Sequence, residues 1–223
     1  IVGGTKNVVL DRVRDLSPDL ILANKEENVR DQVEALATIA PVFVTDVATV
    51  DDAEAMIRAV GLLVGRAPAA DRLADDLHAR FDALAAEVAG APVLRALYLI
   101  WRDPWMAAGR DTIIADLLRR GGFEPAVDAD RYPALTDGEI GALAPDAVLL
   151  SSEPYPFREV HLAEVRALVP HATVVLVEGE PFSWYGPRLA EAPAALRGLR
   201  QRLNARAPAS ARDGGARTSE PGR

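Results

Sequence analysis

The sequence predicts an α/β protein in which a long rigid helix joins two Rossmann-like lobes with parallel sheets. Three observations support this fold class: a strand motif that occurs twice, a helical segment between its copies, and aromatic loops after the strands of the second copy. The expected parts are an incomplete N-terminal α/β lobe at residues 1–50, a helical linker at 51–90, a C-terminal α/β lobe at 91–205 and a disordered tail at 206–223.

The duplicated motif is read directly from two segments. Residues 16–28 are LSPDLILANKEEN, and residues 143–155 are LAPDAVLLSSEPY. Both contain Leu-x-Pro-Asp, an apolar run of strand length, two polar residues and a glutamate, and in both a helical pattern and a second apolar run follow. Apolar runs that alternate with helices are typical of buried parallel strands. The alternative, a chance similarity between two common strand beginnings, stays open.

The segment between the copies, residues 50–89, has apolar residues at helical spacing and no strand pattern. Asp51 and Asp52 favour a helix start, since carboxylates stabilise the first turn. Pro68 marks the junction of two helices, because proline is accepted in a first turn and breaks a helix interior. At about 1.5 Å per residue, the second helix is about 30 Å long, enough to bridge two lobes and hold their spacing.

The second lobe opens with an apolar strand at residues 94–101 and a helix at 112–120 that ends at Gly121-Gly122. The first lobe has no counterpart of this pair before Leu16. If the lobes are duplicates, the first strand and helix of the first lobe are missing. We therefore expect an N-terminally incomplete protein whose first lobe exposes a sheet edge.

Composition and motifs exclude several classes of function. Lysine and arginine total 25 against 33 aspartates and glutamates, and the net charge of −8 disfavours nucleic acid as a partner. The absence of cysteine excludes disulfides and thiol chemistry. His78, His161 and His171 share no ligand spacing, and the sequence lacks G-x-S-x-G, Walker A and G-x-G-x-x-G motifs. We expect a binding protein that is not an enzyme and has no resident metal or cofactor.

Aromatic residues gather in the loops that follow strands of the second lobe. All three tryptophans, Trp101, Trp105 and Trp184, lie there, although aromatic residues make up only 5% of the chain. Open α/β sheets bind ligands at the carboxyl ends of their strands, and aromatic rings form flat apolar surfaces. These loops are therefore the predicted ligand site. Trp101, still in register with its strand, is expected to fill the core instead.

Each copy of the motif also places a carboxylate after its strand. These are Glu26 and Glu27 in the first copy and Glu153 in the second. Two negative points related by a pseudo-twofold axis fit two basic pockets of a symmetric partner. The alternative, ordinary solvated loop glutamates, stays open.

The chain resembles a known family. The segments VGGTKN, LSPDLILANKEEN, PVFVTDVATVDDA, GRDTIIADLLRRGG and PFSWYGPR are similar to those of ABC-importer substrate-binding proteins of the helical-backbone class, and the resemblance extends to about Leu203. That class includes receptors for vitamin B12, ferric siderophores and haem, and the nearest resemblance is to the cobalamin-binding branch. It implies a monomeric periplasmic protein, or one anchored outside the cytoplasm, that binds a corrinoid or related metal chelate in the cleft between its lobes. The ligand is then delivered to an ABC-transporter permease in the inner membrane.

The resemblance also implies roles for individual residues. The ligand contacts fall on Trp105, Met106, Arg110, Tyr155, Glu180, Phe182, Trp184 and Tyr185. Glu26 or Glu27 in one lobe and Glu153 in the other enter arginine pockets on the permease. Asn24 stands where B12 receptors often have tryptophan, which weakens the case for cobalamin itself, and Arg102, Arg110 and Arg188 suit anionic chelates. A bare cation or oxyanion as ligand, a non-transporting sensor of the same fold, and a two-lobed enzyme such as a glycosyltransferase remain as alternatives.

Overall fold

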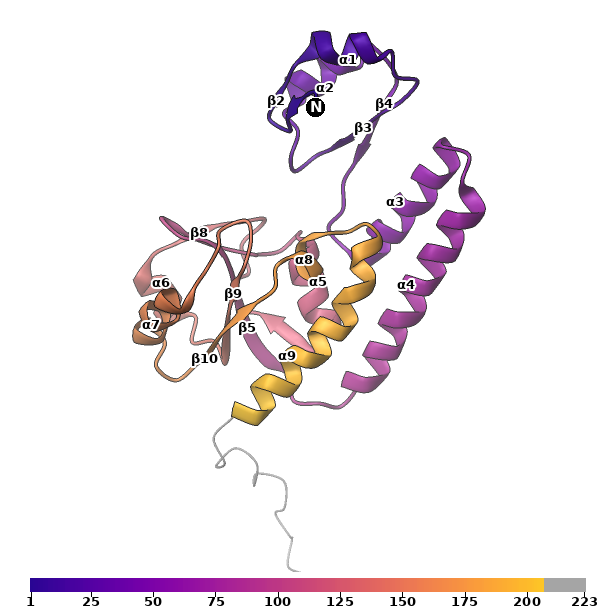
Figure 1. Cartoon of the computed structure of the whole chain (residues 1–223). Helices are drawn as coiled ribbons and strands as arrows, with labels where there is room; N and C mark the ends of the chain where they lie inside the picture. Colours follow the sequence, from indigo (N-terminus) through magenta and orange to yellow (C-terminus); the bar gives the residue numbers. More distant parts are fainter. Residues whose placement is uncertain (207–223) are drawn as a thin grey trace, which may run out of the picture. The chain divides into compact units, whose positions relative to one another are not determined.

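The computed structural model describes residues 1–206, so all of the predicted disordered tail except Arg206 lies outside the described residues. The chain forms two compact units, Ile1–Val47 and Ala48–Arg223, and Figure 1 shows the order of their elements. The segment predicted as a linker groups with the second unit. The three-part division of the chain stays a prediction. No described helix combines the length and apolar character needed to cross a membrane.

The first unit is a small α/β arrangement around two parallel strands. Residue Ile21 lies opposite Val42 in this pair, and the preceding hairpin is antiparallel. Leu22 and Val44 remain 50% and 44% exposed, since a two-stranded sheet offers little surface for packing. The elements are β1 (Gly3–Gly4), β2 (Asn7–Val8), α1 (Leu10–Leu16), β3 (Ile21–Asn24), α2 (Arg30–Leu36) and β4 (Val42–Thr45).

The predicted helical segment is a hairpin of α3 (Val50–Leu63) and α4 (Ala67–Val88). Thr49 caps α3 in a reciprocal box with Asp52, and Pro68 lies in the first turn of α4, as predicted. Arg58 on α3 forms ion pairs with Asp71 and Asp75 on α4, at 2.8 and 2.6 Å. The two helices therefore pack side by side, so the segment is a folded pair of helices and not one continuous rod (Figure 1).

The sheet of the second unit has the order β10-β9-β5-β6-β8, with β7 paired to β5. The strands β10, β9, β5 and β7 are parallel, whereas β6 and β8 are antiparallel additions. The sheet therefore contains the predicted parallel strands, and the antiparallel β6 and β8, which were not predicted, make it a mixed sheet. The strands are β5 (Leu94–Trp101), β6 (Trp105–Ala107), β7 (Phe123–Pro125), β8 (Ala134–Leu135), β9 (Ala147–Ser151) and β10 (Thr173–Val177).

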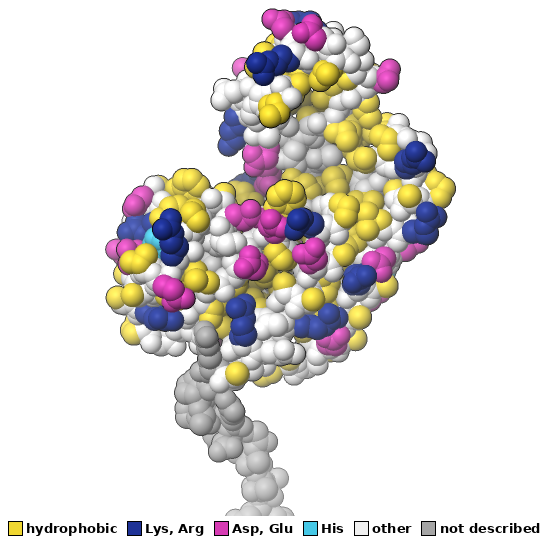
Figure 2. Space-filling model, in the orientation of Figure 1, with side chains coloured by type: hydrophobic (Ala, Val, Ile, Leu, Met, Phe, Trp, Pro, Cys, Tyr) yellow, Lys and Arg dark blue, Asp and Glu magenta, His cyan; other side chains and the backbone are white. Residues whose placement is uncertain are grey.

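Helices cover both faces of this sheet. Figure 1 shows α6 and α7 on one side and α5, α8 and α9 on the other. The first face buries a cluster of strand residues that alternate along β5 and β9, which are Leu97, Leu99, Val148 and Leu150. On the face seen in Figure 2, acidic and basic side chains of the second unit are interspersed. The helices are α5 (Ile113–Arg120), α6 (Asp137–Ala142), α7 (Glu159–Leu168), α8 (Glu180–Ser183), the 3₁₀ turn η1 (Pro187–Glu191) and α9 (Ala192–Arg206).

A buried arginine joins α9 to the rest of the second unit. Arg200 is 7% exposed, and its guanidinium donates to the carbonyls of Gly121, Gly122 and Pro92 at 3.2, 2.8 and 2.9 Å. Burial lowers the pKa of Arg200, because the charged form loses hydration. The accepting carbonyls at the end of α5 are the negative end of a helix, which favours a cation there.

The same order of elements occurs in both units. In each, a parallel strand pair encloses one helix: β3-α2-β4 in the first and β9-α7-β10 in the second. The second edge of β9 pairs with β5, whereas β3 pairs only with β4 among the described residues. This shared β-α-β unit is the structural counterpart of the duplicated sequence motif.

Candidate ligand-binding site

The carboxyl ends of β10, β9 and β5 form one edge of the second unit. Because these strands are parallel neighbours, the segments that follow them lie side by side. The residues are Trp101 at the end of β5, Glu153 and Tyr155 after β9, and Trp184 after α8, which follows β10. We call this set the aromatic row. It lies wholly within the second unit.

Trp101 and Tyr155 form one half of the row. Trp101 is 40% exposed, and its ring meets that of Tyr155 edge-on with centroids 5.6 Å apart. The Tyr155 ring also packs on Phe157 at 4.8 Å, and its hydroxyl lies 3.2 Å from Nε2 of His161. Tyr155 is half-buried, and these three contacts hold its ring in one orientation.

Trp184 and Glu153 form the other half. Trp184 is 51% exposed, and its indole Nε1 donates to Oε1 of Glu153 at 2.9 Å. Arg188, which is ion-paired with Glu180, lies 5.7 Å from the centroid of the indole ring. The indole is therefore held by its polar edge, and a face of the ring remains for an apolar contact.

A buried network positions the loop that carries Glu153. The hydroxyl of Tyr98 donates to Oγ of Ser151 at 3.1 Å, and Ser151 donates to the carbonyl of Glu153 at 2.6 Å. Burial raises the pKa of Tyr98, because the phenolate cannot be hydrated there. Gly179 closes the site from the β10 side: a Cβ there would lie 2.6 Å from Oγ of Ser151 and 2.5 Å from Cγ of Glu153. Only glycine fits this approach of the two loops without a shift.

Two predicted ligand contacts lie in the core. Trp105 is 4% exposed, stacks on Phe157 at 6.2 Å and donates its indole N–H to Asp137 at 2.8 Å. Phe182 is 2% exposed and packs on the ring of Tyr98 at 5.4 Å. Both rings are buried, so the exposed aromatic surface consists of the predicted Tyr155 and Trp184 together with Trp101, which was not predicted to belong to it.

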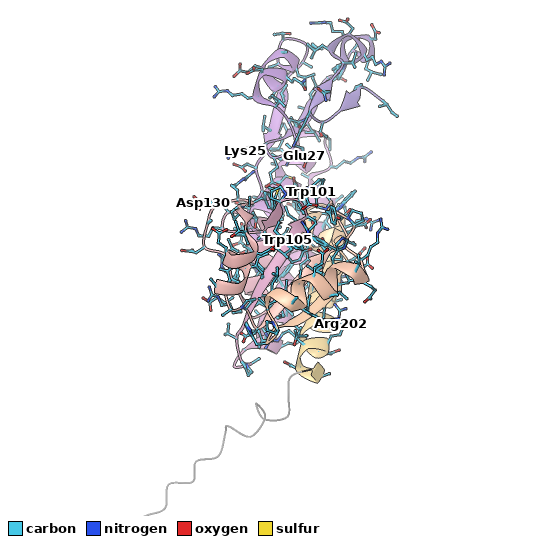
Figure 3. All side chains as sticks on the ribbon, turned by 90° about the vertical axis from the view of Figure 1, so that its left-hand side faces the viewer. Lys25, Glu27, Trp101, Trp105, Asp130 and Arg202 are labelled. Carbon is cyan, nitrogen blue, oxygen red and sulfur yellow. The ribbon has the colours of Figure 1, made fainter. Side chains whose placement is uncertain are left out.

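Trp101 and Trp105 have exchanged the places expected for them (Figure 3). The sequence predicted that Trp101 fills the core and Trp105 faces the ligand. The reason is β6: the chain turns back after Trp101, and the short antiparallel strand inserts Trp105 under Arg102, whose guanidinium lies 4.3 Å from its ring centroid. With the core filled by Trp105, Trp101 remains at the rim of the sheet.

The other predicted contacts are not gathered at one point. Arg110 is ion-paired with Asp130 at 2.9 Å and Asp128 at 3.5 Å, in a cluster of its own beside β6. Met106 is half-buried within β6, where it pairs with Trp101 and Ala134. Glu180 and Tyr185, which are close to Trp184 in the sequence, are partly buried. Their role in ligand binding stays a prediction.

The loop of Glu26 and Glu27 in the first unit is shaped by Asn24. Its Oδ1 accepts the backbone N–H groups of Glu26 and Glu27 at 2.9 and 3.1 Å. Lys25 is ion-paired with Asp46, and Glu27 is exposed, with Thr5 donating to it at 3.4 Å (Figure 3). The loop thus presents an acidic side chain on a fixed backbone.

Besides Trp101, sequence reasoning missed His161 at this site. It occupies the third position of α7, and its Nδ1 accepts the backbone N–H of Arg158 at 2.9 Å. Glu139 and Asp52 accept the corresponding backbone N–H groups at the starts of α6 and α3. The capping spacing was the available signal. Within residues 1–206 no three acidic or histidine side chains form a group that could hold a metal ion.

Comparison with known proteins identifies the class. The chain belongs to the periplasmic binding protein family, whose sequence model matches residues 2–170. This confirms the resemblance found in the sequence.

Individual relatives share much of its length. The vitamin B12-binding protein of Pectobacterium carotovorum subsp. carotovorum (strain PC1) is 26% identical over 194 residues, which are 84% of this chain and 69% of the relative. The periplasmic haem-binding protein BhuT, solved with two haems, has a TM-score of 0.74 at 24% identity, over 92% of this chain and 81% of that one. The periplasmic vitamin B12-binding protein BtuF of Vibrio cholerae has a TM-score of 0.77 at 15% identity, over 91% and 82%. The two structures confirm the predicted α/β fold.

Proposed function

We propose that this protein is the substrate-binding component of an ABC importer, acting outside the cytoplasm. Its ligand is a corrinoid or a related metal chelate, such as haem or a ferric siderophore, which it delivers to a membrane permease. Family membership supports the binding role, and relatives named for vitamin B12 and haem support the ligand class.

The observation that carries the proposal is the aromatic row. Trp101 and Trp184 are large rings that stay 40% and 51% exposed in a chain with few aromatic residues. Each is fixed by a neighbour, Tyr155 in one case and Glu153 in the other. Rigid, exposed rings at the carboxyl edge of an α/β sheet suit the flat apolar face of a macrocyclic chelate.

A thermal-shift screen tests the binding role. The probes are cyanocobalamin, cobinamide, haemin and a small set of ferric siderophores. A ligand present at 100 times its Kd stabilises the native state by about 2.7 kcal/mol, which raises the Tm of a domain of this size by about 5–10 °C. We expect such a rise with at least one chelate. A flat response to all of them would contradict the proposal.

We further propose that Glu27 or Glu26 in the first unit and Glu153 in the second dock on arginines of the permease. Exposure of Glu27 supports its part, and the fixed loop of Glu153 supports the other. The test replaces all three by glutamine, which removes the charges and keeps an amide oxygen to accept the Trp184 N–H. Ligand affinity should be unchanged and transport in a reconstituted importer lost. Glu124→Gln, at an exposed position on β7, is the matched control. Normal transport by the triple variant would refute docking through these residues.

A further inference from the structure

The hydrogen bonds of His161 fix the position of its proton. Its Nδ1 accepts the backbone N–H of Arg158 at 2.9 Å, so Nδ1 presents a lone pair. In a neutral imidazole the proton is then on Nε2. Nε2 lies 3.2 Å from the hydroxyl oxygen of Tyr155, and it therefore donates to that oxygen.

This assignment determines what the Tyr155 hydroxyl offers. A phenol oxygen that accepts a hydrogen bond keeps its own O–H to donate. Among the described residues, His161 is the only hydrogen-bonding partner recorded for this hydroxyl. Contacts with Trp101, Phe157 and His161, at ring-centroid distances of 5.6, 4.8 and 5.4 Å, keep the Tyr155 ring from turning away. Tyr155 is thus an oriented donor beside an exposed indole.

Trp184, in the other half of the row, has no free hydrogen-bond donor. The indole N–H of Trp184 is already taken by Glu153 at 2.9 Å, so Trp184 offers its ring face. The row therefore combines an apolar face at one end with a hydrogen-bond donor at the other. A planar ligand fits if it has an acceptor oxygen at its rim.

We infer that His161 is a positioning residue that holds the Tyr155 hydroxyl as a donor to a carbonyl or carboxylate oxygen at the rim of the bound chelate. This inference rests on the proposed function. Amide-bearing corrinoids and the carboxylates of haem both supply such an oxygen, and a ligand that presents only donors at this point is rejected.

The experiment separates the two hydrogen bonds of His161. His161→Asn keeps an acceptor for the Arg158 N–H. An asparagine side chain is as long as that of Asp52, which accepts the backbone N–H of Thr49 at 3.0 Å from the same position at the start of α3. The substitution removes the donor to Tyr155. His161→Gln keeps both, since its amide has an acceptor and a donor, and Glu139 shows that this length reaches the cap at 2.7 Å. His171→Asn, at an exposed turn, is the control.

Affinity is measured by isothermal titration calorimetry with cyanocobalamin and with haemin. Tyr155→Phe and His161→Asn should each weaken binding by about 3- to 10-fold, the range of one hydrogen bond. The double variant should be no weaker than either single one, because both remove the same contact. His161→Gln should stay within about 2-fold of wild type. All variants should melt within about 6 °C of wild type, since one lost hydrogen bond costs about 0.5–1.5 kcal/mol. The probe that responds identifies the acceptor as an amide or a carboxylate.

The outcomes are distinguishable. If wild type binds a chelate and Tyr155→Phe and His161→Asn bind it equally well, the inference is wrong and the proposed function stands. If the losses add in the double variant, or His161→Gln fails to restore affinity, His161 acts through packing and the inference is wrong. If wild type binds none of the chelates, the proposed function fails and the inference fails with it.

Discussion

Because Trp105 is buried and Trp101 is exposed, we predict that their alanine variants differ in stability. Trp105 is 4% exposed, stacks on Phe157 and donates to Asp137 at 2.8 Å. Truncating a buried tryptophan costs about 3–5 kcal/mol, and the lost bond to a carboxylate places Trp105→Ala at the upper end. Trp101 is 40% exposed and makes one edge-on contact with Tyr155, worth about 0.5–1.5 kcal/mol.

Thermal unfolding followed by circular dichroism compares the two variants. At about 2–4 °C per kcal/mol, Trp105→Ala should lower the Tm by about 6–20 °C, whereas Trp101→Ala should lower it by less than about 6 °C. Trp101→Ala should weaken chelate binding despite its small effect on stability. Equal destabilisation by both, or a neutral Trp105→Ala, would refute the placement of Trp105 in the core.

Three further changes test other parts of the second unit by thermal unfolding. Arg200→Met removes the donor of one buried and two partly buried carbonyls, which costs roughly 1–3 kcal/mol. At about 2–4 °C per kcal/mol the Tm should fall by about 2–12 °C, and an unchanged Tm would contradict the role of Arg200 in joining α9 to the unit. Thr49→Ala should cost about 1 kcal/mol by removing the cap of α3, whereas Thr49→Ser should retain it. The backbone N–H of Thr136 donates to the Glu139 carboxylate at 2.7 Å and lowers the pKa of Glu139 below its ordinary 4.5. The stabilisation from this hydrogen bond is therefore present above pH 4.5 and is lost as the pH falls through the folded-state pKa of Glu139. Wild type should accordingly exceed Glu139→Gln in Tm at pH 7, and the difference should shrink as the pH falls below 4.5; a pH-independent difference would refute it.

The parts of the fold that follow from local pattern could be predicted. The apolar runs that became β3, β5 and β9, and the junction of two helices at Pro68, depend on neighbours in the sequence. The short strands β6, β7 and β8 could not, because two or three residues carry no periodicity and their pairing is set by distant partners.

Most residues of the aromatic row were named from the sequence, but the places of Trp101 and Trp105 were not predicted. The rule that ligands bind at the carboxyl ends of strands selected the loops that the structure brings side by side within the second unit, and ligand binding there stays a prediction. Which ring is buried depends on the fold of β6 under Arg102, a tertiary contact that the spacing of Trp101 and Trp105 does not contain. The capping spacing indicated the bond between His161 and Arg158. The bond between His161 and Tyr155 joins a helix position to a loop position, and no local pattern indicated it.

The central claim is that the aromatic row of the second unit binds a planar metal chelate. Isothermal titration calorimetry of wild type and of the Trp101→Ala/Trp184→Ala double variant, with whichever chelate raises the Tm most, tests it directly. The account predicts a Kd in the micromolar range or tighter for wild type and at least about a tenfold loss in the variant, which removes two ring contacts. Equal affinity of the two proteins would show that the chelate binds elsewhere and would contradict the account.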